Sequence, residues 1–537
     1  MKAGWICPPA STGEELSVKQ NRIAAIDIGT NSIRSMVIQV DAAGKYRILD
    51  DEKVTVRLGE GLNQTGNISR AAWERALEAL TRQKKIIDGY QVLSIEAVAT
   101  SAVRKAKNGG DFIAAIKSAI GLEVAVISGE AEAELAALSA FHHFDLEGVH
   151  HLIFDIGGGS LELVSALGTH IEQILSLELG AVFLTENFLK SDPAAPAEQL
   201  KMRKHIRKAL KNAFGDQELP ARHCLIGSGG TVTSIAAMTM AGRRQRYDSS
   251  HGYELLRSEV VHLLAMLLRM SDKERRSLPG LSPDRADIII AGVTVVDELM
   301  DFFQVNLLRV NERGIREGLI LQGLRKHHLL PQQKAPRSWR ESVQEFARSC
   351  HFDEEHSRQV TKLALEIFHA IAPRFGCTDK DRRLLEAAAE LHDIGYFINY
   401  SSHHKHSYHL IRHADLFGFT PRERELIANI ARYHRKSLPK KKHDTYTRLA
   451  DEDQTLVSLL GGILRLCDGL DRRRNSVVEG IDCTLSKGTL RLALRGRGDM
   501  SVELFSAKDK SDLLQGACQL KLVIEAPGIS AAPEPAP

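Results

Sequence analysis

The stretch IAAIDIGTNSIRSMVI (23–38) has the same pattern of residue types as HLIFDIGGGSLELVSA (151–166), which lies 128 positions further along the chain. In both copies an apolar run typical of a β-strand ends in Asp, one residue and a glycine-containing turn, and a second apolar run follows. A repeat of this kind indicates a duplicated structural unit, here a β-turn-β element. The sequence therefore predicts an α/β fold with two similar lobes that face each other.

The two turns have the composition of phosphate-binding loops. Glycine allows the positive φ of a tight turn, so that successive N–H groups point at one anion. Asp27 and Asp155 end the strands that lead into the turns, and they would repel a phosphate unless a divalent cation lay between them; Mg²⁺ is the expected ion. One such turn alone is more often an ordinary hairpin, but two matching turns favour a phosphate site. The residues predicted to bind phosphate are Gly29, Thr30, Asn31, Ser32, Gly157, Gly158, Gly159 and Ser160, with Gly229, Gly230 and Thr231 from a third glycine-rich stretch, GSGGTVTSIA (227–236).

The composition is that of an ordinary globular protein. Of 537 residues, 43% are hydrophobic and 26% charged, which excludes disordered, collagenous and coiled-coil chains. The seven cysteines form no CxxC pair, and they predict reduced thiols in a cytosolic protein rather than disulfides or a zinc knuckle. The longest mainly apolar stretch, 286–296, is too short to cross a bilayer, and the first residues lack the apolar stretch of a signal peptide.

The pattern along the chain predicts several domains. We expect α/β lobes over 21–142 and 143–328, a linker over 331–337, a helical domain over 338–475 and a small α/β domain over 476–527. In that last domain, strands are expected at 489–496, 501–507 and 519–526. Residues 1–20 and 528–537 are expected to be disordered tails.

Further motifs connect the lobes to a known family. VISGEAEAEL (126–135), TSAVRKAKN (100–108), DIGGGSLELV (155–164) and LSPDRADIIIAG (281–292) occur in the order found in the exopolyphosphatase and guanosine pentaphosphate phosphohydrolase (Ppx/GppA) family, which the chain resembles. The resemblance implies two ribonuclease H-like lobes of the actin, sugar kinase and Hsp70-like ATPase superfamily. It also implies Mg²⁺-dependent hydrolysis of the terminal phosphate of inorganic polyphosphate, or of the 5′ phosphate of pppGpp.

The same resemblance assigns roles to individual residues. Glu132 matches the catalytic glutamate that activates water, and Arg104 matches an arginine that contacts phosphate. Asp155 and Glu162 match acidic residues near the metal and the water. Without the resemblance, the sequence around Glu132 would be interpreted as an exposed helix start.

In the helical half, His356, His392, Asp393 and Asp468 follow the order H…HD…D, which resembles the HD-domain signature and implies a second divalent metal. Imidazole and carboxylate ligands suit Mn, Fe, Zn or Mg. Two interpretations stay open: inherited scaffolding that shapes a substrate channel, or a retained metal with a second phosphohydrolase site. The stretch HHKHSYH (403–409) and His434 could equally be phosphate-binding or surface histidines.

Basic clusters at 201–211, 243–246, 434–443 and 471–474 fit a long polyanion, which favours polyphosphate over pppGpp, although each cluster alone is more often a solvated surface. Few aromatic residues lie among them, so nucleic acid is not an expected partner. A kinase, a nucleotide sensor and an HD phosphohydrolase regulated by the lobes are the alternatives to a polyphosphatase. A homodimer is expected from the resemblance.

Overall fold

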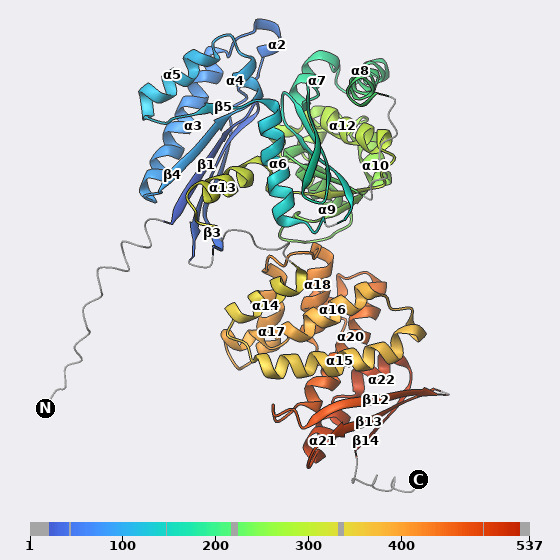
Figure 1. The fold of residues 1–537 in the computed structure, drawn as a ribbon. Helices are drawn as coiled ribbons and strands as arrows, with labels where there is room; N and C mark the ends of the chain where they lie inside the picture. The colour runs from blue at the N-terminus through green and yellow to red at the C-terminus, as the bar shows by residue number, and fades with distance from the viewer. Residues whose placement is uncertain are drawn as a thin grey trace, which may run out of the picture. The chain divides into compact units, whose positions relative to one another are not determined.

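The structure, a computed structural model, describes residues 21–41, 44–146, 148–215, 224–330, 338–486 and 488–526 (Figure 1). The predicted tails at 1–20 and 528–537 and the predicted linker at 331–337 lie outside the described residues. The chain divides into two units, Met1–Pro336 and Arg337–Pro537. Among the described helices, none has the length and apolar character that crossing a bilayer requires.

The first unit begins with a five-stranded sheet of order β3-β2-β1-β4-β5. β1 and β2 form an antiparallel hairpin, while β4 runs parallel to β1, so the turn after β1 and the end of β4 lie at one edge of the sheet. The helices α3 and α5 bury an apolar face against the sheet through residues such as Leu80 and Phe112. The elements are β1 (Arg22–Ile28), β2 (Ser32–Val40), β3 (Tyr46–Thr55), α2 (Leu62–Thr65), α3 (Arg70–Gly89), β4 (Ser94–Ala99), α4 (Ser101–Lys105), α5 (Gly109–Ile120) and β5 (Ala125–Val126).

A second sheet, of order β10-β11-β9-β6-β7-β8, repeats this plan. β6 and β7 form the antiparallel hairpin and β9 runs parallel to β6, as β4 does to β1. The predicted α/β fold with a duplicated β-turn-β unit is therefore confirmed. The elements are β6 (His150–Ile156), β7 (Leu161–Leu167), β8 (His170–Leu177), α7 (Ala181–Phe188), α8 (Pro196–Phe214), β9 (Leu225–Ser228), α9 (Gly230–Gly242), β10 (Glu254–Leu256), α10 (Arg257–Leu267), α11 (Asp272–Arg275), η1 (Pro283–Arg285), α12 (Ile289–Phe302) and β11 (Leu307–Val310).

Two helices, α6 (Gly129–His143) and α13 (Gly314–Lys326), pack against each other between the sheets (Figure 1). They cross closely, because a Cβ atom at Gly318 would lie only 2.1 Å from the carbonyl oxygen of Leu135. α13 comes from the end of the expected second lobe, yet its Leu319 packs with Ile23 of the first sheet. The predicted domain boundaries stay predictions, and this helix pair joins the two sheets into one unit.

The second unit is helical and ends in a small sheet of order β12-β13-β14, with a single hydrophobic core shared by the helices and the sheet. Amphipathic periodicity and strong caps define the helices; Ser338 and Thr420, for example, each accept a hydrogen bond from the third helical N–H. The elements are α14 (Trp339–Ser349), α15 (Glu354–Phe375), α16 (Asp379–Leu391), η2 (Ile394–Phe397), α17 (His403–His413), α18 (Pro421–Arg432), α19 (Asp444–Thr447), α20 (Asp451–Leu470), β12 (Val478–Ser486), β13 (Thr489–Gly496), α21 (Ser501–Asp509), α22 (Asp512–Cys518) and β14 (Lys521–Glu525).

One predicted strand, 501–507, is wrong, because this segment forms helix α21. The Asp499 side chain accepts a hydrogen bond from the Ser501 N–H at 2.9 Å, which helps to start a helix. Leu504 and Ala507 are buried while Phe505 is exposed, a spacing that fits a helix and not the alternation of a strand.

Candidate active site

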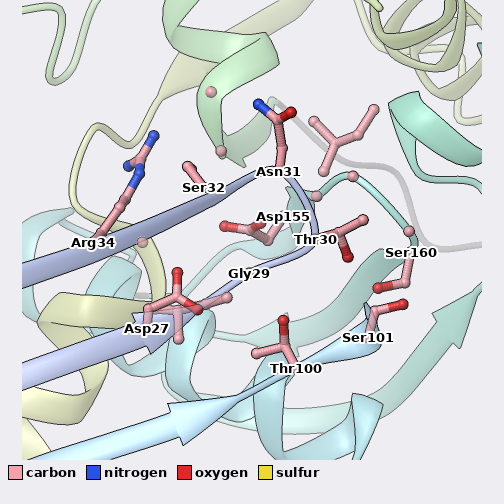
Figure 2. A pocket seen from close by; sticks show the side chains of 18 of the residues that line it. Asp27, Gly29, Thr30, Asn31, Ser32, Arg34, Thr100, Ser101, Asp155 and Ser160 are labelled. Atoms are coloured by element: carbon pink, nitrogen blue, oxygen red, sulfur yellow. The ribbon is translucent and has the colours of Figure 1, made fainter. Parts of the chain in front are cut away.

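The two repeated turns lie together in one cleft of the first unit (Figure 2). Each turn is closed by the same backbone hydrogen bond, from Gly29 N to Ser32 O and from Gly157 N to Ser160 O, both at 3.1 Å. The turns also touch, because a Cβ atom at Gly158 would lie 2.9 Å from Cβ of Thr30. Two loops that are 128 positions apart in sequence thus share a wall of the same cleft.

The third glycine-rich stretch supplies the N-terminus of α9. Gly229 adopts a φ of 94°, and a Cβ atom at Gly230 would lie 1.9 Å from Nη2 of Arg285. Only glycine therefore lets this guanidinium reach the helix N-terminus. Thr231 does not line the cleft. Its side chain is buried against Gly292, where an added Cβ atom would lie 2.5 Å from Cγ2 of Thr231.

Asp27 and Asp155 end β1 and β6 and both line the cleft. Burial raises the pKa of Asp27 to about 6, against the opposing effect of the Arg34 and Arg316 charges, and burial also raises the pKa of Asp155. Oδ1 of Asp27 is buried and has no hydrogen-bond partner among the described residues. An unpartnered carboxylate oxygen beside a second buried carboxylate fits a hard divalent cation.

Glu132 lies in the first turn of α6, which begins after Ser128, whose Oγ accepts a hydrogen bond from Ala131 N. It lines the cleft with only 4% of its surface exposed. Burial, assisted by the charge of Glu162, raises the pKa of Glu132 well above its ordinary value. The sequence motif alone suggested an exposed helix start, whereas packing of α6 between the sheets buries this carboxylate.

Arg104 and Glu162 are not among the residues that line the cleft, but both act on Glu132. Nη1 of Arg104 lies 3.3 Å from Oε2 of Glu132 and donates to the Ile127 carbonyl at 2.6 Å. Glu162 lies opposite Asp155 in the β6–β7 ladder and accepts a hydrogen bond from Ser176. Burial raises the pKa of Glu162 to about 8, with a contribution from Asp155.

Several residues of the cleft were not predicted. They are cationic or polar: Arg34, Thr100, Ser101, Arg285, Glu312, Arg313 and Arg316. The sequence did contain a signal for Arg34. Counting residue pairs outward from the tight turn places Arg34 on β2 directly opposite Asp27 on β1. Arg285 lies inside one of the quoted motifs, but only the fold brings its guanidinium to Gly230. Burial, with a contribution from the Arg34 charge, lowers the pKa of Arg285 to about 10.

Part of the basic clusters forms ion pairs within the fold. Arg203 and Arg207 of α8 both form ion pairs with the buried Glu298 of α12. Likewise Arg243 pairs with Glu259, and Arg473 with Glu503. These guanidinium groups neutralise carboxylates, of which Glu298 and Glu503 are buried, so a preference for long polyanions cannot be argued from these arginines.

In the second unit the four predicted metal ligands do meet. Nε2 of His356 lies 3.5 Å from Oδ1 of Asp468 and 3.8 Å from Oδ2 of Asp393, and Nε2 of His392 lies 3.7 Å from Oδ1 of Asp393. His403 and His434, for which the sequence suggested only phosphate or surface roles, join the same group. Sequence order alone could not reveal them, because α17 and the end of α18 reach the group only through the helix packing.

The facing sheets, the matching turns and the buried carboxylates define a two-lobed protein with the actin-like ATPase fold. The chain belongs to the Ppx/GppA phosphatase family, whose model matches residues 36–327, and the model for domain III of these phosphatases matches residues 339–503. It is therefore a phosphoanhydride hydrolase of the class that acts on polyphosphate or pppGpp.

Solved structures of relatives agree with this assignment. A crystal structure of the Aquifex aeolicus member of the Ppx/GppA family shares 30% identity over 57% of this chain and 98% of its own, with a TM-score of 0.50. A crystal structure of an exopolyphosphatase from Cytophaga hutchinsonii shares 27% identity over 58% of this chain and 100% of its own, with a TM-score of 0.54.

Proposed function

We propose that this chain is an exopolyphosphatase that hydrolyses the terminal phosphate of inorganic polyphosphate with Mg²⁺ in the cleft of the first unit. The observation that carries the proposal is the lining of the cleft. Four arginines line it, Arg34, Arg285, Arg313 and Arg316, and no aromatic side chain does among the described residues. A guanine base would be expected to stack on an aromatic ring, whereas a linear inorganic anion needs only donors and positive charge.

The proposed metal ligands are Asp27 and Asp155. When bound, Mg²⁺ would supply positive charge to the terminal phosphate and its leaving group. The turn N–H groups of both hairpins and the arginines of the cleft would neutralise the remaining charge, so that phosphate is held in one orientation. The side chains of Asn31, Ser32 and Ser160 would donate further hydrogen bonds from the turns.

Glu132 is the proposed general base. It would accept a proton from the attacking water as the water oxygen bonds to the terminal phosphorus and the P–O bond to the rest of the chain breaks. The products are orthophosphate and a polyphosphate shorter by one unit, with the shortened chain leaving as the anion. The raised pKa of Glu132 makes it a better proton acceptor, and Arg104 would act as a positioning residue that holds its carboxylate.

A substrate comparison tests this function. Purified protein is expected to hydrolyse long-chain polyphosphate with a kcat/KM more than about tenfold above that for pppGpp, a difference of roughly 1.4 kcal/mol in transition-state binding. Initial rates of orthophosphate release at equal Mg²⁺ measure it. Equal rates, or a higher rate on pppGpp, would show that the cleft recognises a nucleotide, and production of ADP from ATP only when an acceptor is added would show a kinase.

Removing a metal ligand is expected to raise the Mg²⁺ requirement. In Asp27→Asn, the Mg²⁺ concentration that gives half of the maximal rate should increase more than about tenfold. This is the lower end of the loss of metal affinity that follows when a metal site is disturbed. Asp50→Asn is the matched control, because Asp50 lies on the same sheet and does not line the cleft. An unchanged Mg²⁺ dependence in Asp27→Asn would contradict the proposed ligand.

The homodimer and the cytosolic location stay predictions. Sedimentation of the purified chain at several concentrations measures the first, and a single species of monomer mass would contradict it.

A further inference from the structure

Six metal-type ligands from separate helical segments meet in the second unit. His356 comes from α15, His403 from α17 and Asp468 from α20, while His392, Asp393 and His434 follow the ends of α16 and α18. All except Asp468 are at least nine-tenths buried. Burying four imidazoles and two carboxylates together is costly, since buried charged and polar groups lose their hydration. Arg474 pairs with Oδ2 of Asp393 and Lys510 with Oδ2 of Asp468, which leaves the other oxygen of each carboxylate and the imidazole Nε2 atoms to bind a cation.

The histidine tautomers are set so that Nε2 faces the centre of the group. Nδ1 of His392 and of His434 donates to a backbone carbonyl, of Ala389 and Ala431 respectively, at 2.7 Å. A carbonyl can only accept, so Nδ1 carries the proton and Nε2 keeps its lone pair. Nδ1 of His356 is likewise held by Asp471 at 2.8 Å. Metal-binding histidines are oriented in this way by their outer hydrogen bonds.

Several of the inward atoms have no other partner. Nε2 of His356, Nε2 of His392 and Oδ1 of Asp393 are buried and make no hydrogen bond of normal geometry among the described residues. Nε2 of His403 lies 3.1 Å from Oδ1 of Asp393 and 3.2 Å from Nε2 of His434. Ligand atoms about 2.0–2.2 Å from one ion are roughly 3.0–3.5 Å apart, so this spacing is close to that of a coordination shell.

The ligand atoms form two triads that share one carboxylate. His356, His392 and Asp393 are one triad; Asp393, His403 and His434 are the other, and within each the ligand atoms lie within 4.8 Å of one another. We propose that the second unit holds a binuclear metal centre, bridged by Asp393, that hydrolyses phosphate esters independently of the cleft in the first unit. His403 and His434 extend the four-residue set expected from the sequence to a second ion, and Asp468 completes the shell of the first.

Two ions sharing a carboxylate suit phosphoester hydrolysis, because one can hold the attacking water while the other holds the phosphate and its leaving oxygen. In this step the water oxygen bonds to phosphorus, and the P–O bond to the leaving alcohol or phenol breaks. The proton lost by the water is taken up by the leaving oxygen. The mixture of imidazole and carboxylate ligands suits first-row ions such as Mn²⁺ or Fe²⁺.

The surroundings indicate an anionic substrate with an aromatic group. Nη1 of Arg435 lies 3.1 Å from Nδ1 of His403, where it can turn to a bound phosphate. The ring of Tyr396 stacks on that of His403 with a centroid distance of 4.0 Å, and the adjacent Phe397 and Tyr400 are 57% and 68% exposed. Exposed aromatic rings beside a phosphate site are suited to stack on an aromatic leaving group or a nucleobase.

Metal content tests the centre directly. The purified full chain, reconstituted with Mn²⁺ and desalted, is expected to retain about two ions per chain by plasma mass spectrometry, the number of a two-metal site. His356→Ala and His403→Ala should each lose about one of them. His409→Ala is the matched control, because His409 lies on α17 with an exposed side chain. A wild-type chain that retains no ion, or a single ion that His403→Ala also retains, overturns the binuclear centre.

Hydrolysis of bis(p-nitrophenyl) phosphate tests the activity. The Mn²⁺-loaded chain is expected to release p-nitrophenol, and His403→Ala should lower that rate more than about 10²-fold, the scale on which disturbed metal sites lose activity. The rate should change less than about twofold in Glu132→Gln, which alters only the other site. An ester activity that falls with Glu132→Gln and not with His403→Ala belongs to the cleft of the first unit and overturns the proposal. A circular dichroism melt confirms that each variant is folded.

Discussion

Glu132→Gln is expected to lower kcat for polyphosphate by about 10²–10⁴-fold, the usual contribution of a positioned general base. The amide has the size of the carboxylate but cannot accept a proton from water, whereas the turns, the arginines and the proposed metal ligands are left in place. KM should therefore change little, because substrate binding does not depend on the base. Steady-state rates of orthophosphate release measure both constants.

Glu134→Gln is the matched control for this variant. Glu134 lies two residues further along α6 and its side chain is exposed, so the same change of charge on the same helix should leave kcat unaltered. Near-full activity in Glu132→Gln would show that another group activates the water. Activity lost equally in both variants would instead trace the loss to α6 as a whole.

Gly158→Ala is expected to lower kcat/KM by about 10²-fold, because displacing reacting groups by about an ångström has an effect of that size. The added Cβ would lie 2.9 Å from Cβ and 3.0 Å from Cγ2 of Thr30. Thr30 is β-branched and cannot move its side chain aside without moving the backbone of its own turn. The two turns that are proposed to hold the phosphate should then separate. Rates on polyphosphate, together with a thermal melt, measure the effect.

A double-mutant cycle shows whether the two turns contact each other. Thr30→Gly removes the two closest atoms that an alanine at position 158 would meet and leaves Cγ2 of Val182 at 3.2 Å, so the combined variant should recover part of the rate lost in Gly158→Ala. Gly110→Ala on α5 is the control, since a Cβ atom there meets nothing within 4 Å. Strictly additive losses from Thr30→Gly and Gly158→Ala would show that the turns act separately.

Much of the candidate site can be predicted from local sequence because its parts are local structures. A tight turn after a strand places Asp27 near the N–H groups of Gly29 to Ser32, whatever the rest of the chain does. The same holds for Asp155 and the glycine run that follows it. Thr231 is the exception, because its neighbours in the motif line the cleft while Thr231 itself faces Gly292 and the core.

The residues that sequence reasoning missed come from other elements. Arg285 and Arg316 lie far along the chain from both turns, and they reach the cleft only after η1 and α13 pack beside the sheets. The secondary structure of segment 501–507 also depends on tertiary packing. Its mixed pattern fits either a strand or a helix, and the side on which the core lies decides between them.

By itself, the sequence determined that two equivalent strand-turn-strand units would be built, since hydrophobic periodicity and glycine act over a few residues. It also determined which side chains stand at the turn of each unit. Only the tertiary structure decided that the two turns share one cleft, that Glu132 is buried there and that His403 and His434 join His356 around Asp393. These outcomes depend on contacts between residues far apart in the chain, and such contacts form only when the helices and sheets bury their apolar faces together.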